Sequence, residues 1–147
     1  MSDAMRIEGL ADMQEAVYPE GGAYHEFVVS GSEIVEGENK DGDGYVAWKL
    51  TLKKSGPGSD AYSPVSNSIF FPSNRDDAEQ AARNKRDLKR AAVALGVDLA
   101  ELGGGKPHGA VAAAIGKIVN IKLDMVERKK GAHAGESFPT LRWPKFE

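Results

Sequence analysis

The strongest constraint on the fold is the position of a single long helical stretch. Between residues 73 and 96 apolar residues recur about every 3.6 positions, whereas before and after this stretch they alternate as in β-strands. The apolar stripe of this helix is narrow and most of its side chains are small; it consists of Ala78, Ala81, Leu88, Ala92 and Leu95. Ser73 or Asn74 is expected to cap the start of this helix, and Gly96 is expected to end it. The chain therefore folds around one long helix set within a series of strands.

The clearest strand covers residues 45–54, YVAWKLTLKK. Its strict alternation places Val46, Trp48, Leu50 and Leu52 on one face and Tyr45, Ala47, Lys49, Thr51 and Lys53 on the other. The first face is predicted to be core, and we therefore interpret Trp48 as a core residue. The opposite face presents an aromatic ring and two lysines to solvent or to a ligand.

Four further segments have strand character. A long first strand follows Gly21 and Gly22 and reaches about Glu36, with Gly31 indicating a bulge or bend. The other three segments cover residues 65–71, 117–127 and 138–147, the last of them broken by a proline. In the third strand Phe70 and Phe71 point in opposite directions, and the sequence leaves open which of them is exposed.

The resulting order is strand, strand, strand, helix, strand, strand. We therefore predict a mainly β fold, a five-stranded OB-fold-like barrel, with the longer helix between strands three and four. A short second helix is expected to begin at Pro107. The alternative is a mostly antiparallel sheet with a helix on one face. Residues 1–20 have no clear period and are interpreted as a flexible acidic arm, and residues 21–147 as the barrel domain.

The residue composition and spacing argue against several kinds of functional site. Without cysteine the chain forms no disulfide and no thiolate metal site, and its histidines, His25, His108 and His133, lack the spacing of a zinc site. The loop over residues 37–44 resembles the start of a calcium loop but lacks the twelfth-position Glu and the flanking helices. The segment GGGKPHG lacks the spacing of a phosphate-binding loop. We predict no metal, no cofactor, no catalytic residue and no enzymatic activity.

The charge is unevenly distributed along the chain. The net charge is −3, but residues 1–44 carry eleven acids against two bases, and residues 45–147 carry seventeen bases against eleven acids. Because salt screens charges over about 8–10 Å, a local basic surface attracts a polyanion even when the total charge is negative. The sequence contains neither a secretory signal nor an apolar run of about 20 residues. A cytoplasmic location without a membrane partner is expected.

Aromatic and basic residues alternate on the predicted strands and their loops. Nucleic-acid bases stack on aromatic rings, and basic side chains hold the phosphates, so this pattern favours binding of single-stranded nucleic acid. The candidate binding residues are Tyr45, Lys49, Lys53, Lys54, Lys117, Lys122, Arg128, Lys129, Lys130, Arg142, Trp143 and Lys145. The rings expected to be exposed for stacking are Tyr45, Trp143 and Phe146. The helix bases Arg83, Arg86 and Arg90 are interpreted as a solvated helix face.

The layout resembles a known family. The segments GAYHEFVVSGSEIVEG, GYVAWKLTL, SIFFP, KRAAVALGV, IGKIVNIKLDMV and LRWPKF are similar to those of small phage-encoded proteins that carry a domain of unknown function. These proteins are regarded as single-stranded DNA-binding or recombination-associated, and the similarity covers about residues 20–146. It implies an OB-type barrel, binding of single-stranded DNA and a role in replication, recombination or repair in the host cytoplasm. It transfers no catalytic residue.

The resemblance does not specify the protein partners of the chain. Bacterial single-strand-binding proteins end in an acidic tail that recruits partners, whereas this chain ends in WPKFE, so recruitment would fall to the acidic N-terminal arm. Replication or recombination proteins and further copies of the chain are the partners that it allows. The alternative function is a protein-interaction or assembly module without nucleic acid, in which Trp143, Pro144 and Phe146 form a docking tail.

Overall fold

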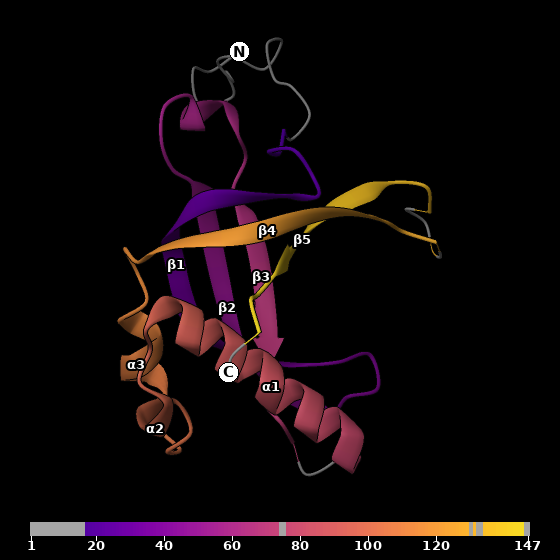
Figure 1. Cartoon of the computed structure of the whole chain (residues 1–147). Coiled ribbons are helices and arrows are strands. Elements are labelled where there is room, and N and C mark those ends of the chain that lie inside the picture. Colours follow the sequence, from indigo (N-terminus) through magenta and orange to yellow (C-terminus); the bar gives the residue numbers. More distant parts are fainter. Residues whose placement is uncertain (1–16, 74–75, 130, 132–133, 146–147) are drawn as a thin grey trace, which may run out of the picture.

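A single antiparallel sheet dominates the computed structural model, which describes residues 17–73, 76–129, 131 and 134–145. The strands are β1 (Ala23–Glu38), β2 (Gly44–Lys54), β3 (Val65–Phe70), β4 (Ile118–Glu127) and β5 (Ser137–Arg142). The helices are α1 (Ala78–Leu95), α2 (Leu99–Leu102) and α3 (His108–Ala112), and a 3-10 turn, η3, covers Ser59–Ala61. The α-helices gather at one end of the sheet and η3 lies at the other (Figure 1). The mainly β class is confirmed.

The strand β1 joins the two halves of the sheet. It pairs with β2 from Phe27 to Glu38 and with β4 from Ala23 to Val28, in the spatial order β3-β2-β1-β4-β5. The register with β2 shifts at Gly31, which confirms the predicted bulge. The described sheet is open, because its outer strands β3 and β5 are not paired with each other.

The inner face of the sheet and one stripe of α1 form the core. The largest fully buried side chains are Trp48, Phe27, Leu50, Leu52, Ile121 and Leu123. From α1 the core receives Leu88, Ala91, Ala92 and Leu95. The predicted core position of Trp48 is confirmed, since none of its surface is exposed. Met125, on the core-facing side of β4, is exposed because the β4–β5 hairpin extends beyond the rest of the sheet (Figure 1).

The long helix begins later than the sequence predicts. Its N-cap is Asp77, whose carboxylate accepts a hydrogen bond of 2.7 Å from the backbone amide three residues on. Ser73 is not the cap, because its own amide donates to the carboxylate of Asp76 at 2.8 Å. Asn74 lies outside the described residues. Gly96 ends the helix as predicted, in the left-handed conformation (φ +68°) that a glycine adopts without strain.

Two short helices follow α1 and pack at the same end of the sheet. The predicted start of the second of them, α3, is confirmed, since Pro107 is its N-cap residue. The four-residue helix α2 was not predicted, because so short a segment shows no periodicity. Leu102 of α2 and Val111 of α3 are buried in the core.

Two segments that the sequence marks as loops are anchored by local hydrogen bonds. Residues 1–16 of the predicted arm lie outside the described part of the chain, but Val17 exchanges hydrogen bonds with Ser63 in the segment after η3. In the β1–β2 loop, the side-chain oxygen of Asn39 accepts from the amides of Asp41 and Asp43 at 2.9 and 3.0 Å. Across the described ranges no three His, Asp or Glu side chains gather as metal ligands.

A buried hydrogen-bond relay ties the sheet to α3. The indole N–H of Trp48 donates to Ser32 Oγ at 2.8 Å, and the Ser32 hydroxyl donates to the carbonyl of Val111 at 2.6 Å. Substituting Ser32→Ala leaves the buried indole N–H of Trp48 without an acceptor, while the Val111 carbonyl keeps the bond from the Ala114 amide. We therefore expect the free energy of unfolding in urea to fall by about 1–3 kcal/mol. Ser66→Ala, at an exposed position of β3, is the control and should change it by less than about 0.5 kcal/mol. Equal losses in the two variants would contradict the structural role of the relay.

Candidate nucleic-acid interface

Two exposed aromatic rings lie together on the solvent face of β2 and β3. The rings of Tyr45 and Phe70 meet edge to face, with centroids 5.5 Å apart and planes at 76°. They are 37% and 47% exposed, respectively. We call them the aromatic pair. Phe71 points to the other side and packs against the core, which settles the alternative that the sequence left open.

The position of Tyr45 depends on a glycine in the neighbouring strand. Gly37 is its partner across the β1–β2 ladder, and a Cβ atom at Gly37 would lie 2.6 Å from the Tyr45 hydroxyl oxygen. Only the missing side chain allows the ring to lie over the backbone of β1. The aromatic pair is therefore positioned by three adjacent strands.

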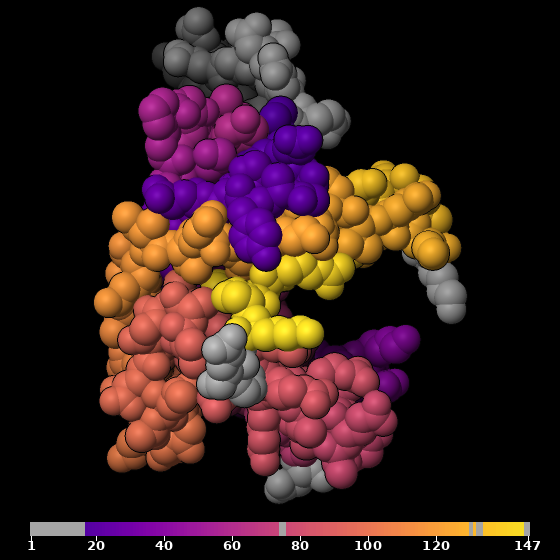
Figure 2. Space-filling view, in the orientation of Figure 1, coloured from indigo at the N-terminus to yellow at the C-terminus, as the bar shows by residue number. Residues whose placement is uncertain are grey.

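Two hollows flank Phe70, and Phe70 and Asn84 line both of them. The first, of about 450 Å³, lies between Phe70 and the β1–β2 loop. The second, of about 370 Å³, lies between the edge of β3, the helix α1 and the chain at the end of β5. We call the two hollows together the groove. The space-filling view shows the molecule hollowed between the β4–β5 hairpin and the β1–β2 loop, above α1 (Figure 2).

The two hollows differ in charge. The first is lined by the carboxylates of Asp43 and Asp76, and no basic residue is among its described lining residues. The second is lined by Arg90, Arg142 and Lys145, with Asp87 as its acid. An anionic ligand is therefore attracted to the second hollow, which lies at the seam between β3 and β5.

Several of the predicted binding residues meet at the groove. Tyr45 lines the first hollow, and Arg142, Trp143 and Lys145 line the second. Lys49 extends from the same face of β2, where its cross-strand partners are Glu33 on β1 and Ser68 on β3. These residues are far apart in the sequence, and the sheet brings them together.

The remaining predicted residues of β2 and β4 lie away from the groove. Lys53 forms an ion pair of 3.8 Å with the exposed Asp60. Lys54 shares the inner face of β2, and its ammonium lies 5.9 Å from the ring centroid of Tyr62. Lys117 precedes β4 and is exposed.

The predicted residues of the β4–β5 region are divided between the sheet and the hairpin. Lys122 faces solvent on β4, between Tyr24 of β1 and Arg142 of β5. The Arg128 guanidinium lies 4.5 Å from the ring centroid of Phe138. Lys129 is exposed beyond the end of β4. Lys130 and Phe146 lie outside the described residues.

The prediction that the Trp143 ring is exposed is wrong. Its ring is half-buried against the core, and its indole N–H donates to the side-chain oxygen of Asn67 on β3 at 2.9 Å. The chain that leaves β5 turns toward β3, so the ring fills the gap between the two unpaired strands. Trp143 holds the seam together and leaves the aromatic pair as the exposed rings of the groove.

Sequence reasoning missed three residues on these surfaces. Phe70 could have been assigned, because it has the same strand parity as the polar Ser66 and Ser68. Tyr24 is exposed opposite Lys122, and the alternation of β1 also predicts its outward direction. Arg90 was interpreted as a solvated helix base, and only the contact between α1 and the seam places it at the groove.

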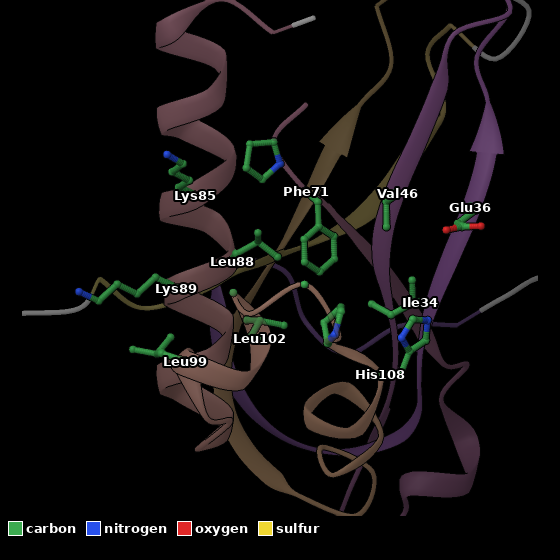
Figure 3. Close-up of a pocket in the computed structure, with 14 residues that line it drawn as sticks. Ile34, Glu36, Val46, Phe71, Lys85, Leu88, Lys89, Leu99, Leu102 and His108 are labelled. Atoms are coloured by element: carbon green, nitrogen blue, oxygen red, sulfur yellow. The ribbon is translucent and has the colours of Figure 1, made fainter. Parts of the chain in front are cut away.

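A separate apolar cavity of about 670 Å³ lies between the helices and the strands β1 and β2 (Figure 3). Its apolar lining residues include Ile34, Val46, Phe71, Leu88, Leu99 and Leu102. Lys85 and Lys89 of α1 lie on one side of it, and Glu36 and His108 lie on the other. The volume is typical of a site for a small molecule or for a few side chains of a partner.

No protein-family model matches the sequence, and no curated protein matches it. In the part of the chain that the structure describes, no helix is both long and apolar enough to span a bilayer.

Proposed function

We propose that this protein binds single-stranded DNA without sequence specificity, with bases stacked on the aromatic pair and phosphates held at the basic end of the groove. The observation that carries the proposal is the exposed contact between Tyr45 and Phe70 beside a hollow lined by three bases. Stacking of one base on an aromatic ring contributes about 1–3 kcal/mol and tolerates any sequence, because every base has a π-face. No catalytic residue, cofactor or metal takes part.

The arrangement of the sheet supports an OB-type barrel as the finer description of the fold. Strand β1 is shared by β2 and β4, and α1 lies between β3 and β4 in the chain. OB-folds bind oligonucleotides on the face of their second and third strands, between the loops that join strands one and two and strands four and five. Here the β1–β2 loop lines the first hollow of the groove, and the end of β5 with the chain after it lines the second. We propose a role in phage DNA replication, recombination or repair in the host cytoplasm.

The experiment is a fluorescence-anisotropy titration of a labelled single strand of about 30 nucleotides, at low and moderate salt, with duplex DNA as competitor. We expect preference for the single strand and an affinity that falls with salt, with a log–log slope of about −0.7 for each phosphate neutralised. The slope should be shallow, because carboxylates such as Glu33 and Asp124 adjoin bases on the same face. No binding at tens of micromolar protein at low salt would overturn the proposal.

The apolar cavity favours a second candidate function, a protein-interaction module. Leu99 at its edge is exposed, and an apolar side chain of a partner would cover it. The predicted docking tail is less suitable than this cavity as a partner-binding site, because its Trp143 already donates a hydrogen bond to Asn67 within the chain. The two functions are distinguished by Lys145→Gln, which removes a base that lines the second hollow and should weaken strand binding, and by Leu99→Asp, which should leave it unchanged.

A further inference from the structure

We propose that the hollow at the β3–β5 seam is a phosphate-binding subsite and that Arg90 of α1 is its principal ligand. The inference rests on the proposed function, since the phosphate would belong to the strand whose bases stack on the aromatic pair. It goes beyond that function because it assigns a helix residue to an interface that the sheet otherwise forms.

The first observation is one unpaired nitrogen of the Arg90 guanidinium. Its side chain lines the hollow, and its Nε atom is buried without a hydrogen-bond partner, the only such side-chain atom in the described part of the chain. The acid of the hollow, Asp87, is not within ion-pair distance of it. A buried donor without an acceptor is destabilising, and a charged one especially so. A bound anion that accepts from this guanidinium would remove that cost.

The second observation is the convergence of further bases on the same hollow. Arg142 at the end of β5 and Lys145 after it reach the hollow from the side opposite α1. The Arg142 Nε donates to a carboxylate oxygen of Asp124 on the neighbouring strand β4 at 3.0 Å, so this guanidinium lines the hollow while it is paired on its β4 side. Three bases therefore line the hollow with Asp87 as the acid of its lining, although Asp124 offsets the charge of Arg142, and the bases come from segments more than fifty residues apart. Such a concentration of positive charge in a concave site favours an anion.

The third observation is the position of the hollow relative to the aromatic pair. Phe70 lines the same space as Arg90, so a base stacked on this ring has its own backbone beside the guanidinium. The hollow on the other side of Phe70 is lined by Asp43 and Asp76, which repel phosphate. The geometry therefore places the backbone of the strand at the seam. Arginine suits this role because its planar fork binds two phosphate oxygens at once.

The test compares two substitutions that remove the same charge from the same helix. Arg90→Gln removes the proposed ligand, and Arg86→Gln removes an exposed base that lines neither hollow. In the single-strand titration we expect Arg90→Gln to weaken binding about tenfold or more. The magnitude of its salt slope should fall by about 0.7. Arg86→Gln should remain within about twofold of the unchanged protein, because screening reduces the effect of a distant charge.

Arg90→Lys and a urea unfolding curve show whether loss of folding explains a weak variant. Lysine keeps the charge but lacks the fork, so its affinity should lie between those of the unchanged protein and Arg90→Gln. If all Arg90 variants unfold at the same urea concentration as the unchanged protein, the loss of binding belongs to the site.

A second measurement uses inorganic phosphate alone as the probe. The arginine Nε–H resonances of the ¹⁵N-labelled full chain are followed by NMR, and the Arg90 signal is assigned by its absence in Arg90→Gln. We expect the Arg90 resonance to shift saturably with phosphate and the Arg86 resonance to remain in place. An unmoved Arg90 resonance would overturn the subsite.

The two measurements separate the subsite from the proposed function. Strand binding that weakens equally in Arg90→Gln and Arg86→Gln overturns the subsite and retains the function. A chain that binds no single strand but shows saturable phosphate binding at Arg90 overturns the function, and the subsite then serves a smaller phosphorylated ligand. Selective loss in Arg90→Gln together with the phosphate shift supports both.

Discussion

Replacing both rings of the aromatic pair by alanine is expected to weaken single-strand binding on the order of 100-fold, since each stacked base contributes about 1–3 kcal/mol. The two losses should not add fully, because Tyr45 and Phe70 touch each other and each ring orients the other. The measurement is the anisotropy titration, carried out for Tyr45→Ala, Phe70→Ala and the double variant. Stability should change little, since both rings are partly exposed.

The matched control for this prediction is Ile118→Ala. Ile118 is 62% exposed on the same outer face of the sheet, but it lies on β4 and lines neither hollow of the groove. Its removal takes away exposed apolar surface without an aromatic ring, so binding should be unchanged. Phe70→Trp should retain binding and Phe70→Leu should not, because stacking requires a π-face. A double variant that binds like the unchanged protein would refute the assignment of the aromatic pair.

The largest expected effect on stability comes from Trp48→Ala, which should lower the free energy of unfolding by about 3–5 kcal/mol. The ring is fully buried between Ile34 and Ile69, its cross-strand partners on β1 and β3. Its removal leaves a large cavity at the centre of the sheet and also deprives Ser32 of a hydrogen-bond donor. Because domains are typically stable by about 5–15 kcal/mol, this one substitution removes a large share of the total.

Urea unfolding followed by far-UV circular dichroism measures this loss. Trp48→Phe is the companion variant, and it should cost clearly less because it keeps most of the ring volume and loses only the indole N–H. Trp143 remains as a fluorescent reporter of the seam in both variants. A loss below about 1 kcal/mol for Trp48→Ala would show that the surrounding core closes over the cavity.

These two experiments test different faces of the same strand. Tyr45 and Trp48 are three residues apart on β2, and their side chains leave the sheet on opposite sides. A substitution at Trp48 should reduce stability, whereas a substitution at Tyr45 should reduce binding. This division follows from the alternation of residues 45–54, which is visible in the sequence itself.

The sequence by itself determined the features that depend on local periodicity. The core face of β2, the bulge at Gly31 and the end of α1 at Gly96 all follow from residues that are neighbours in the chain. The boundary at the start of α1 was less accurate, because Ser73 and Asp77 are both good caps and only the hydrogen bonds decide between them.

Only the tertiary structure decided which side chains meet at the groove. Trp143 lies between basic residues in the sequence, as an exposed binding ring would. Its contact with Asn67, 76 positions earlier, instead makes it part of the seam. Arg90 has the sequence signature of a solvated helix base, yet α1 packs so that it lines a hollow with Arg142. Local sequence patterns do not show which distant segment packs against a given edge of the sheet. Burial of the core decides this packing, and the packing determines where an aromatic ring and three bases come together.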